Sequence, residues 1–165
     1  MSASRVVIIM GVSGCGKTTV GRALAHELGW RFDDADDFHP PANVAKMSAG
    51  VPLTDADRQP WLQAIRRHVE QCLAAGVNAV VTCSALKQTY RRIIVIDPVR
   101  VPVVYLKGSR ELLWQRISSR HGHFMKPDML DSQLADLEEP VHALVVDISP
   151  APEVIVAEIR RGLKL

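Results

Sequence analysis

The sequence lacks most features that mark secreted, membrane-bound or nucleic-acid-binding proteins. It has only three cysteines in 165 residues and no C-x-x-C pair, so it indicates neither a disulfide framework nor a cysteine zinc site. Its unbroken apolar runs are about five residues long, far shorter than a membrane span. A formal net charge of +2 is too small to predict binding to nucleic acid. We therefore expect a cytoplasmic protein that folds as one domain over residues 1–165, without nucleic-acid or membrane partners.

Short runs rich in β-branched residues alternate with helical patterns along the chain. The runs cover residues 6–10, 79–83, 101–106 and 143–148, with a weaker candidate at 30–32. The four main runs are almost continuously apolar, which is typical of strands that are buried on both faces of a parallel sheet. Strands that alternate with helices predict βαβ units and an α/β fold, with helices on both faces of the sheet.

Several helices carry signals for where they begin or end. Gly29 follows a helical face formed by Val20, Leu24 and Leu28, where a C-cap is expected. Ser109 is expected to cap a helix that runs to Ser119, and Pro152 to begin one that runs to Arg161.

The helix with an apolar face over residues 62–72 has a start signal at Pro60, and a cap-like pair precedes it. Pro60 suits the first helical position, because its missing N–H group would have no partner there. Thr54 and Asp57 resemble a capping box, which we assign to a turn before this helix.

A glycine-rich loop follows the first strand. GVSGCGKT, residues 11–18, fits G-x-x-x-x-G-K-S/T without a mismatch and lies between a predicted strand and a predicted helix. In such a loop the backbone N–H groups and the helix N-terminus bind phosphate oxygens. Lys17 is expected to reach the β- and γ-phosphates, and the Thr18 hydroxyl to bind Mg²⁺. The motif predicts a nucleoside triphosphate but does not say what is done with it.

Four aspartates follow the second strand. Asp33, Asp34, Asp36 and Asp37 lie in DDADDFHP, where their mutual repulsion favours a role with a cation or a polyol. One carboxylate is expected to order the water shell of magnesium, and another to accept the proton of an attacking hydroxyl group.

The later strand ends argue against a GTPase switch. No acid ends the run at 79–83, and no N-K-x-D motif occurs in the chain. Asp147 ends the last run and resembles a Walker-B acid. Cys83 is expected to be a small buried strand residue rather than a nucleophile.

Two arginines precede a segment that has the composition of a lid. Arg116 and Arg120 are four residues apart, so they lie on one helix face before Gly122 and Pro127. We expect this lid, at about residues 116–137, to bring guanidinium groups onto a transferring phosphoryl group.

These segments together resemble the gluconate kinases, a group of small P-loop kinases related to the shikimate and adenylate kinases. The matching segments include GVSGCGKTTV, DADDFHPPANVAKMSAGVPLTDADRQPWL, CSALKQTYRR, RHGHFM and SQLADLEEP. The resemblance implies a P-loop fold with a five-stranded parallel sheet in the order 2-3-1-4-5 and a helical lid. It also implies ATP-dependent phosphorylation of D-gluconate at the 6-hydroxyl, with ATP and Mg²⁺ as cofactors, and a homodimer.

The resemblance also assigns roles to individual residues. For catalysis it implies Lys17, Asp36 and Arg120, and for Mg²⁺ it implies Thr18 and Asp34. The implied nucleotide-binding residues are Gly11, Val12, Ser13, Gly14, Cys15, Gly16, Lys17, Thr18, Thr19, Arg116, Arg120 and Pro150. The implied substrate-binding residues are Asp34, Asp36, His39, Arg58, Lys87, Arg91 and His123. Asp33 and Asp37 leave open which carboxylate is the base.

Two other functions remain compatible with the phosphate loop. The first is that of another small-metabolite kinase, which acts on shikimate or a nucleotide. The second is that of a non-enzymatic nucleotide-binding module. The acidic turn and the lid argue against the module. Spacing alone does not distinguish gluconate from another hydroxy acid.

Overall fold

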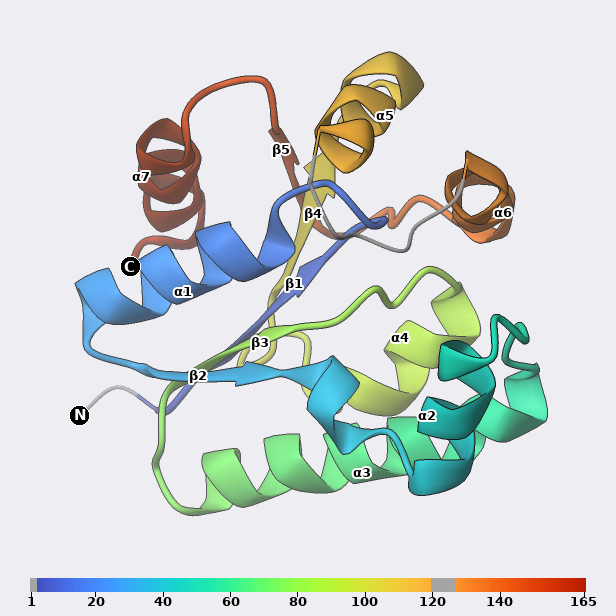
Figure 1. The fold of residues 1–165 in the computed structure, drawn as a ribbon. Helices are drawn as coiled ribbons and strands as arrows, with labels where there is room; N and C mark the ends of the chain where they lie inside the picture. The colour runs from blue at the N-terminus through green and yellow to red at the C-terminus, as the bar shows by residue number, and fades with distance from the viewer. Residues whose placement is uncertain (1–2, 120–126) are drawn as a thin grey trace.

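The apolar runs form the strands of one parallel sheet in the computed structural model, which describes residues 3–119 and 127–165 (Figure 1). The strands are β1 (Val6–Met10), β2 (Arg31–Asp34), β3 (Ala79–Thr82), β4 (Val103–Lys107) and β5 (Leu144–Asp147). Their order is β2-β3-β1-β4-β5, and every neighbouring pair is parallel. The predicted fold class and strand order are therefore confirmed.

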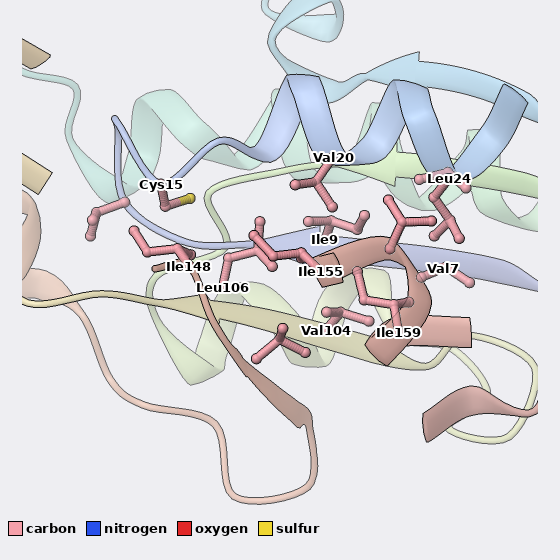
Figure 2. Close-up of a cluster of buried hydrophobic side chains, with 14 of the residues drawn as sticks. Val7, Ile9, Cys15, Val20, Leu24, Val104, Leu106, Ile148, Ile155 and Ile159 are labelled. Carbon is pink, nitrogen blue, oxygen red and sulfur yellow. The ribbon is translucent and has the colours of Figure 1, made fainter. Parts of the chain in front are cut away.

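Helices cover both faces of this sheet. Helices α1 (Lys17–Leu28) and α7 (Pro152–Leu163) lie on one face, and α3 (Asp55–Ala74) and α4 (Gln88–Ile94) lie on the other (Figure 1). Every residue of β1 is fully buried, because alternate side chains enter the two cores. Figure 2 shows the first core, in which α1 and α7 pack over β1 and β4. Burial on both faces explains why the run is continuously apolar.

Most predicted helix boundaries are confirmed. Gly29 ends α1 in the left-handed conformation, with φ of 68°. The Ser109 hydroxyl accepts a hydrogen bond from the Leu112 N–H at the start of α5 (Arg110–Ser118), and α7 begins at Pro152. The other helical elements are η1 (Ala35–Phe38), α2 (Pro41–Ser48) and α6 (Pro127–Asp136). Within the described ranges, no helix is both long and apolar enough to cross a membrane.

The predicted start of α3 at Pro60 is wrong, because the capping box belongs to α3 itself. The Asp57 N–H donates to Thr54 Oγ1 at 3.1 Å, and the Thr54 N–H donates to Asp57 Oδ2 at 2.9 Å. This pair satisfies two N–H groups at once and starts the helix at Asp55. Pro60 then lies inside α3, where its missing N–H removes one backbone hydrogen bond.

The capping box also joins α3 to α2. Lys46 Nζ donates to Asp57 Oδ2 at 2.8 Å, and this hydrogen bond is the main reason that the pKa of Asp57 falls to about 2. We expect Thr54→Ala to lower the free energy of unfolding by about 1 kcal/mol, because the Asp57 N–H loses its partner. Urea titration followed by circular dichroism measures this change. Gln59→Ala, at an exposed position of the same helix, is the control; equal stability of both variants would contradict the prediction.

Candidate functional site

The loop between β1 and α1 has the shape that phosphate binding requires. Gly14 and Gly16 adopt φ values of 85° and 91°, which L side chains rarely adopt. A Cβ at Gly14 would also lie 2.7 Å from Cγ1 of Ile117 on α5. Because α1 begins at Lys17, its unpaired N–H groups and positive dipole end lie at this loop.

The Lys17 side chain folds back over the loop. Its Nζ donates hydrogen bonds to the backbone oxygens of Gly11 at 2.8 Å and Val12 at 3.2 Å. Thr18 and Thr19, on the first turn of α1, are exposed and line the same cavity as Lys17. The ammonium group and two hydroxyl groups thus lie together at the helix N-terminus.

The aspartate-rich segment forms a tight turn at the end of β2. Asp34 Oδ1 accepts a hydrogen bond from the Asp36 N–H at 2.9 Å and caps η1. Trp61 Nε1 on α3 donates to the Ala35 carbonyl at 2.7 Å, so the core helix holds the turn in place. Asp36 lines the cavity and is exposed to solvent. Partial desolvation of its carboxyl group raises its pKa, and the Asp34 charge raises it further, although Lys17 acts in the opposite direction.

The four aspartates have different surroundings. Of the four, only Asp34 and Asp36 line the cavity that the described residues form. Asp33 accepts hydrogen bonds from Arg31 Nε at 2.7 Å and from His68 Nε2 at 2.8 Å. Burial raises the pKa of Asp33, but these hydrogen bonds outweigh burial and the pKa is lowered. Asp33 therefore anchors β2 to α3.

A cavity of about 530 Å³ joins the phosphate loop to the acidic turn. The segment between α2 and α3, the end of β3 and helix α6 complete its walls. The predicted site residues that line it are Ser13, Gly14, Gly16, Lys17, Thr18, Thr19, Asp34, Asp36, His39 and Arg58. A phosphoryl donor on the loop and an acceptor beside Asp36 would therefore lie next to each other in this one cavity.

A second, smaller cavity of about 170 Å³ opens on the other side of the phosphate loop. Arg116 and Pro150 line it, as does Cys15 of the loop. Arg116 Nη2 donates to the Ile148 carbonyl at 2.6 Å, which fixes the guanidinium beside the segment after β5. Both cavities include Gly14, Gly16 and Thr19, so a nucleotide can extend from one to the other across the loop.

Arg58 reaches the large cavity from α3, and Tyr90 of α4 supports it. Arg58 Nη1 donates to the Tyr90 hydroxyl at 3.1 Å, and that hydroxyl donates to Asp55. Lys87 Nζ donates to Asp55 Oδ1 at 3.2 Å and does not line the cavity. The structure thus places Arg58 in the candidate site and Lys87 behind it.

Arg91 also lies outside the cavity and has structural partners. Its side chain is buried, and it donates to the carbonyl oxygens of Ala85 and Glu138, both at 2.7 Å. It therefore holds the loop after β3 against the segment after α6. The predicted site residues Arg120 and His123 lie outside the described residues, as does the middle of the predicted lid at 116–137.

Several cavity residues were not singled out from the sequence, and three of them have side chains that bear on the site. Besides Trp61, they are Gln133 of α6 and Thr82 at the end of β3. The Ser13 N–H donates to Gln133 Oε1 at 2.8 Å, and Gln133 Nε2 donates to Ser13 Oγ at 3.0 Å, so α6 is joined to the phosphate loop. Trp61 and Gln133 lie in the matching segments PWL and SQLADLEEP, which was the only signal for them.

Of the two remaining candidates at strand ends, Cys83 borders the large cavity and Asp147 does not, and neither has a reactive role there. Cys83 is buried, and burial raises the pKa of its thiol to about 12, so it is not a thiolate nucleophile. Asp147 ends the edge strand β5, where its Oδ1 accepts hydrogen bonds from the Ser149 N–H and hydroxyl groups. It caps this turn and does not line the large cavity.

Known proteins resemble this chain over most of its length. A family model described as shikimate kinase matches residues 13–161. The gluconokinase of Gluconobacter oxydans is 50% identical over 136 residues, which cover 82% of this chain and 76% of the relative. The thermoresistant gluconokinase of Escherichia coli is 39% identical and covers 92% of this chain and 89% of its own. The crystal structure of a gluconokinase from Sinorhizobium meliloti superposes with a TM-score of 0.88 at 42% identity, covering 99% and 94% of the two chains.

Proposed function

The chain belongs to the gluconokinase family, and from this membership we propose that it transfers the γ-phosphoryl group of ATP to the 6-hydroxyl of D-gluconate. The products are 6-phospho-D-gluconate and ADP. One observation carries the proposal: a single cavity is lined by Lys17 of the phosphate loop, Asp36 of the acidic turn and the cationic side chain of Arg58.

We assign the nucleotide to the two cavities that meet at the phosphate loop. The triphosphate would bind the loop N–H groups and Lys17, whose ammonium group would exchange backbone carbonyls for phosphate oxygens. The adenine would occupy the smaller cavity beside Arg116 and Pro150. Arg120 is proposed to reach the γ-phosphate, since phosphoryl transfer depends on positioning and charge neutralisation.

The donor groups beside the loop fit Mg²⁺. The Thr18 hydroxyl and the Asp34 carboxylate are oxygen ligands, and both line the cavity. Thr82 Oγ1 is buried without a hydrogen-bond partner among the described residues, and it lies at the end of the strand that pairs with Asp34. A metal-bound water would satisfy this hydroxyl. When bound, Mg²⁺ would neutralise charge on the phosphates, as in other phosphoryl-transfer enzymes.

Gluconate would extend from Asp36 toward Arg58. The Asp36 carboxylate would accept the proton of the attacking hydroxyl, and its raised pKa makes it a stronger base than an aspartate with the ordinary pKa. At the other end, the Arg58 guanidinium would pair with the carboxylate of the sugar acid. Lys87 would act through Asp55 and Tyr90, which support Arg58, and Arg91 would act through the loop after β3 that it holds.

Release of ADP tests the assignment of the acceptor. With ATP and Mg²⁺ present, we expect rapid ADP release with D-gluconate and only background release with shikimate, AMP or glycerate. A coupled spectrophotometric assay measures all four, with a reaction lacking any acceptor as the control. A gluconate rate no higher than this control would overturn the proposed function, and a high rate with AMP or shikimate would identify the alternative.

A further inference from the structure

The imidazole of His39 is held rigidly at the wall of the large cavity. Its ring stacks on Trp61 with a centroid separation of 4.4 Å and an interplanar angle of 11°. Its backbone N–H donates to the Asp36 carbonyl at 3.3 Å, so the ring is tied to the turn that carries the proposed base. A side chain fixed in this way presents one defined edge to a ligand.

The neighbouring side chain of Asn43 determines which ring nitrogen carries the proton. Asn43 is buried, and its Nδ2 donates to the Asp57 carbonyl oxygen at 2.8 Å. Because a carbonyl oxygen only accepts, this bond fixes the orientation of the amide group. The same Nδ2 lies 3.2 Å from His39 Nδ1. An amide nitrogen offers only hydrogens, so Nδ1 must be the acceptor and the proton of the neutral ring must be on Nε2.

The charge around the ring favours this neutral form. Burial lowers the pKa of His39, and the nearby Arg58 guanidinium lowers it further. A protonated ring would also direct an Nδ1–H toward the donor hydrogens of Asn43. With Nδ1 engaged by a buried amide, the ring edge left for the cavity is the one with Nε2.

We propose that Asn43 is a positioning residue that holds His39 as a neutral donor, with its Nε2–H directed at an oxygen atom of the sugar-acid substrate. The identity of that ligand rests on the proposed function, but the tautomer does not. The arrangement selects ligands with an acceptor oxygen at this point, because an apolar group there would leave the Nε2–H unpaired.

Nuclear magnetic resonance of the unaltered protein without substrate tests the tautomer directly. Long-range ¹H–¹⁵N spectra distinguish protonated Nε2, protonated Nδ1 and the imidazolium form, and the His39→Gln variant identifies the His39 signals. At pH 7.5 we expect His39 to be neutral with its proton on Nε2. A proton on Nδ1, or an imidazolium, would overturn the proposal even if gluconate is phosphorylated rapidly.

The nearly isosteric Asn43→Asp variant tests the role of Asn43. Its carboxylate accepts rather than donates, so we expect the proton to move to Nδ1 and the KM for gluconate to rise about tenfold, with kcat changed less than about threefold. In the His39→Gln background no atom corresponds to Nδ1, and Asn43→Asp should then leave KM nearly unchanged. An equal rise of KM in both backgrounds would indicate a merely structural role and contradict the proposal. If gluconate gives no turnover at all, the proposed function fails while the spectra still decide the tautomer.

Discussion

The Asp36→Asn variant is expected to lower kcat for gluconate phosphorylation by about 10²–10⁴-fold while it binds ATP as tightly as the unaltered protein. The amide has nearly the shape of the carboxylate but cannot accept the proton of the attacking hydroxyl. The hydrogen bond from the Asp36 backbone N–H to Asp34 Oδ1 does not involve the side chain that is changed, so the turn should persist. Steady-state kinetics measures kcat, and calorimetric titration with a non-hydrolysable ATP analogue measures binding.

Asp37→Asn is the matched control, because it removes the same charge one residue away. Asp37 is exposed and does not line the large cavity, so this variant should retain kcat within about twofold. If Asp36→Asn kept more than a tenth of the activity, Asp36 would not be the base. A large loss in Asp37→Asn would move the assignment to that neighbour.

The arrangement of the strands could be predicted because local patterns determine it. The apolar runs identified four strands, and the weak signal at 30–32 proved to be the fifth, β2 (Arg31–Asp34), at the sheet edge. The phosphate loop was equally clear, since its glycines, its lysine and the helix after it are contiguous in the chain. In these segments the local sequence pattern agrees with the global fold, so the structure can be predicted from the sequence.

Side-chain partners far apart in the chain could not be predicted in the same way. The sequence left open which of the four aspartates is the base, and the packing of α3 narrows the choice. Asp33 is engaged by His68, 35 residues away, whereas Asp36 remains free to face the cavity. Lys87 and Arg91 looked equally suited to an anionic substrate. In the structure, however, Lys87 donates to Asp55 and Arg91 donates to two backbone carbonyls.

The start of α3 shows how two local signals compete. The sequence pattern favours a start at Pro60 and assigns the capping box of Thr54 and Asp57 to a preceding turn, whereas in the structure the box begins the helix. In the structure the box gains a third member, because Lys46 of α2 donates to the Asp57 carboxylate. That contact places the segment between α2 and α3 on the wall of the cavity. The helix boundary therefore helps to position one wall of the cavity.

The Lys17→Met variant is expected to differ from Asp36→Asn by impairing both ATP binding and turnover. Methionine keeps the length of the side chain but removes the positive charge proposed to act on the β- and γ-phosphates. Loss of such a charge at the transition state lowers kcat by about 10²–10³-fold. Loss of a charge-assisted hydrogen bond raises the KM for ATP by about tenfold or more. Steady-state kinetics with ATP as the varied substrate measures both.

Lys17→Met has a second consequence, because Nζ donates to the carbonyls of Gly11 and Val12. We expect the melting temperature to fall without nucleotide and the stabilisation by added ATP to shrink, since binding stabilises in proportion to affinity. Lys164→Met, at an exposed position beyond α7, controls for the lost charge and should change neither value. An unchanged KM for ATP with kcat within tenfold would contradict the role of Lys17. If turnover fell while ATP binding stayed intact, Lys17→Met and Asp36→Asn would have the same kinetic effect. The proposed division, in which the phosphate loop binds ATP and the acidic turn activates the acceptor, would then be wrong.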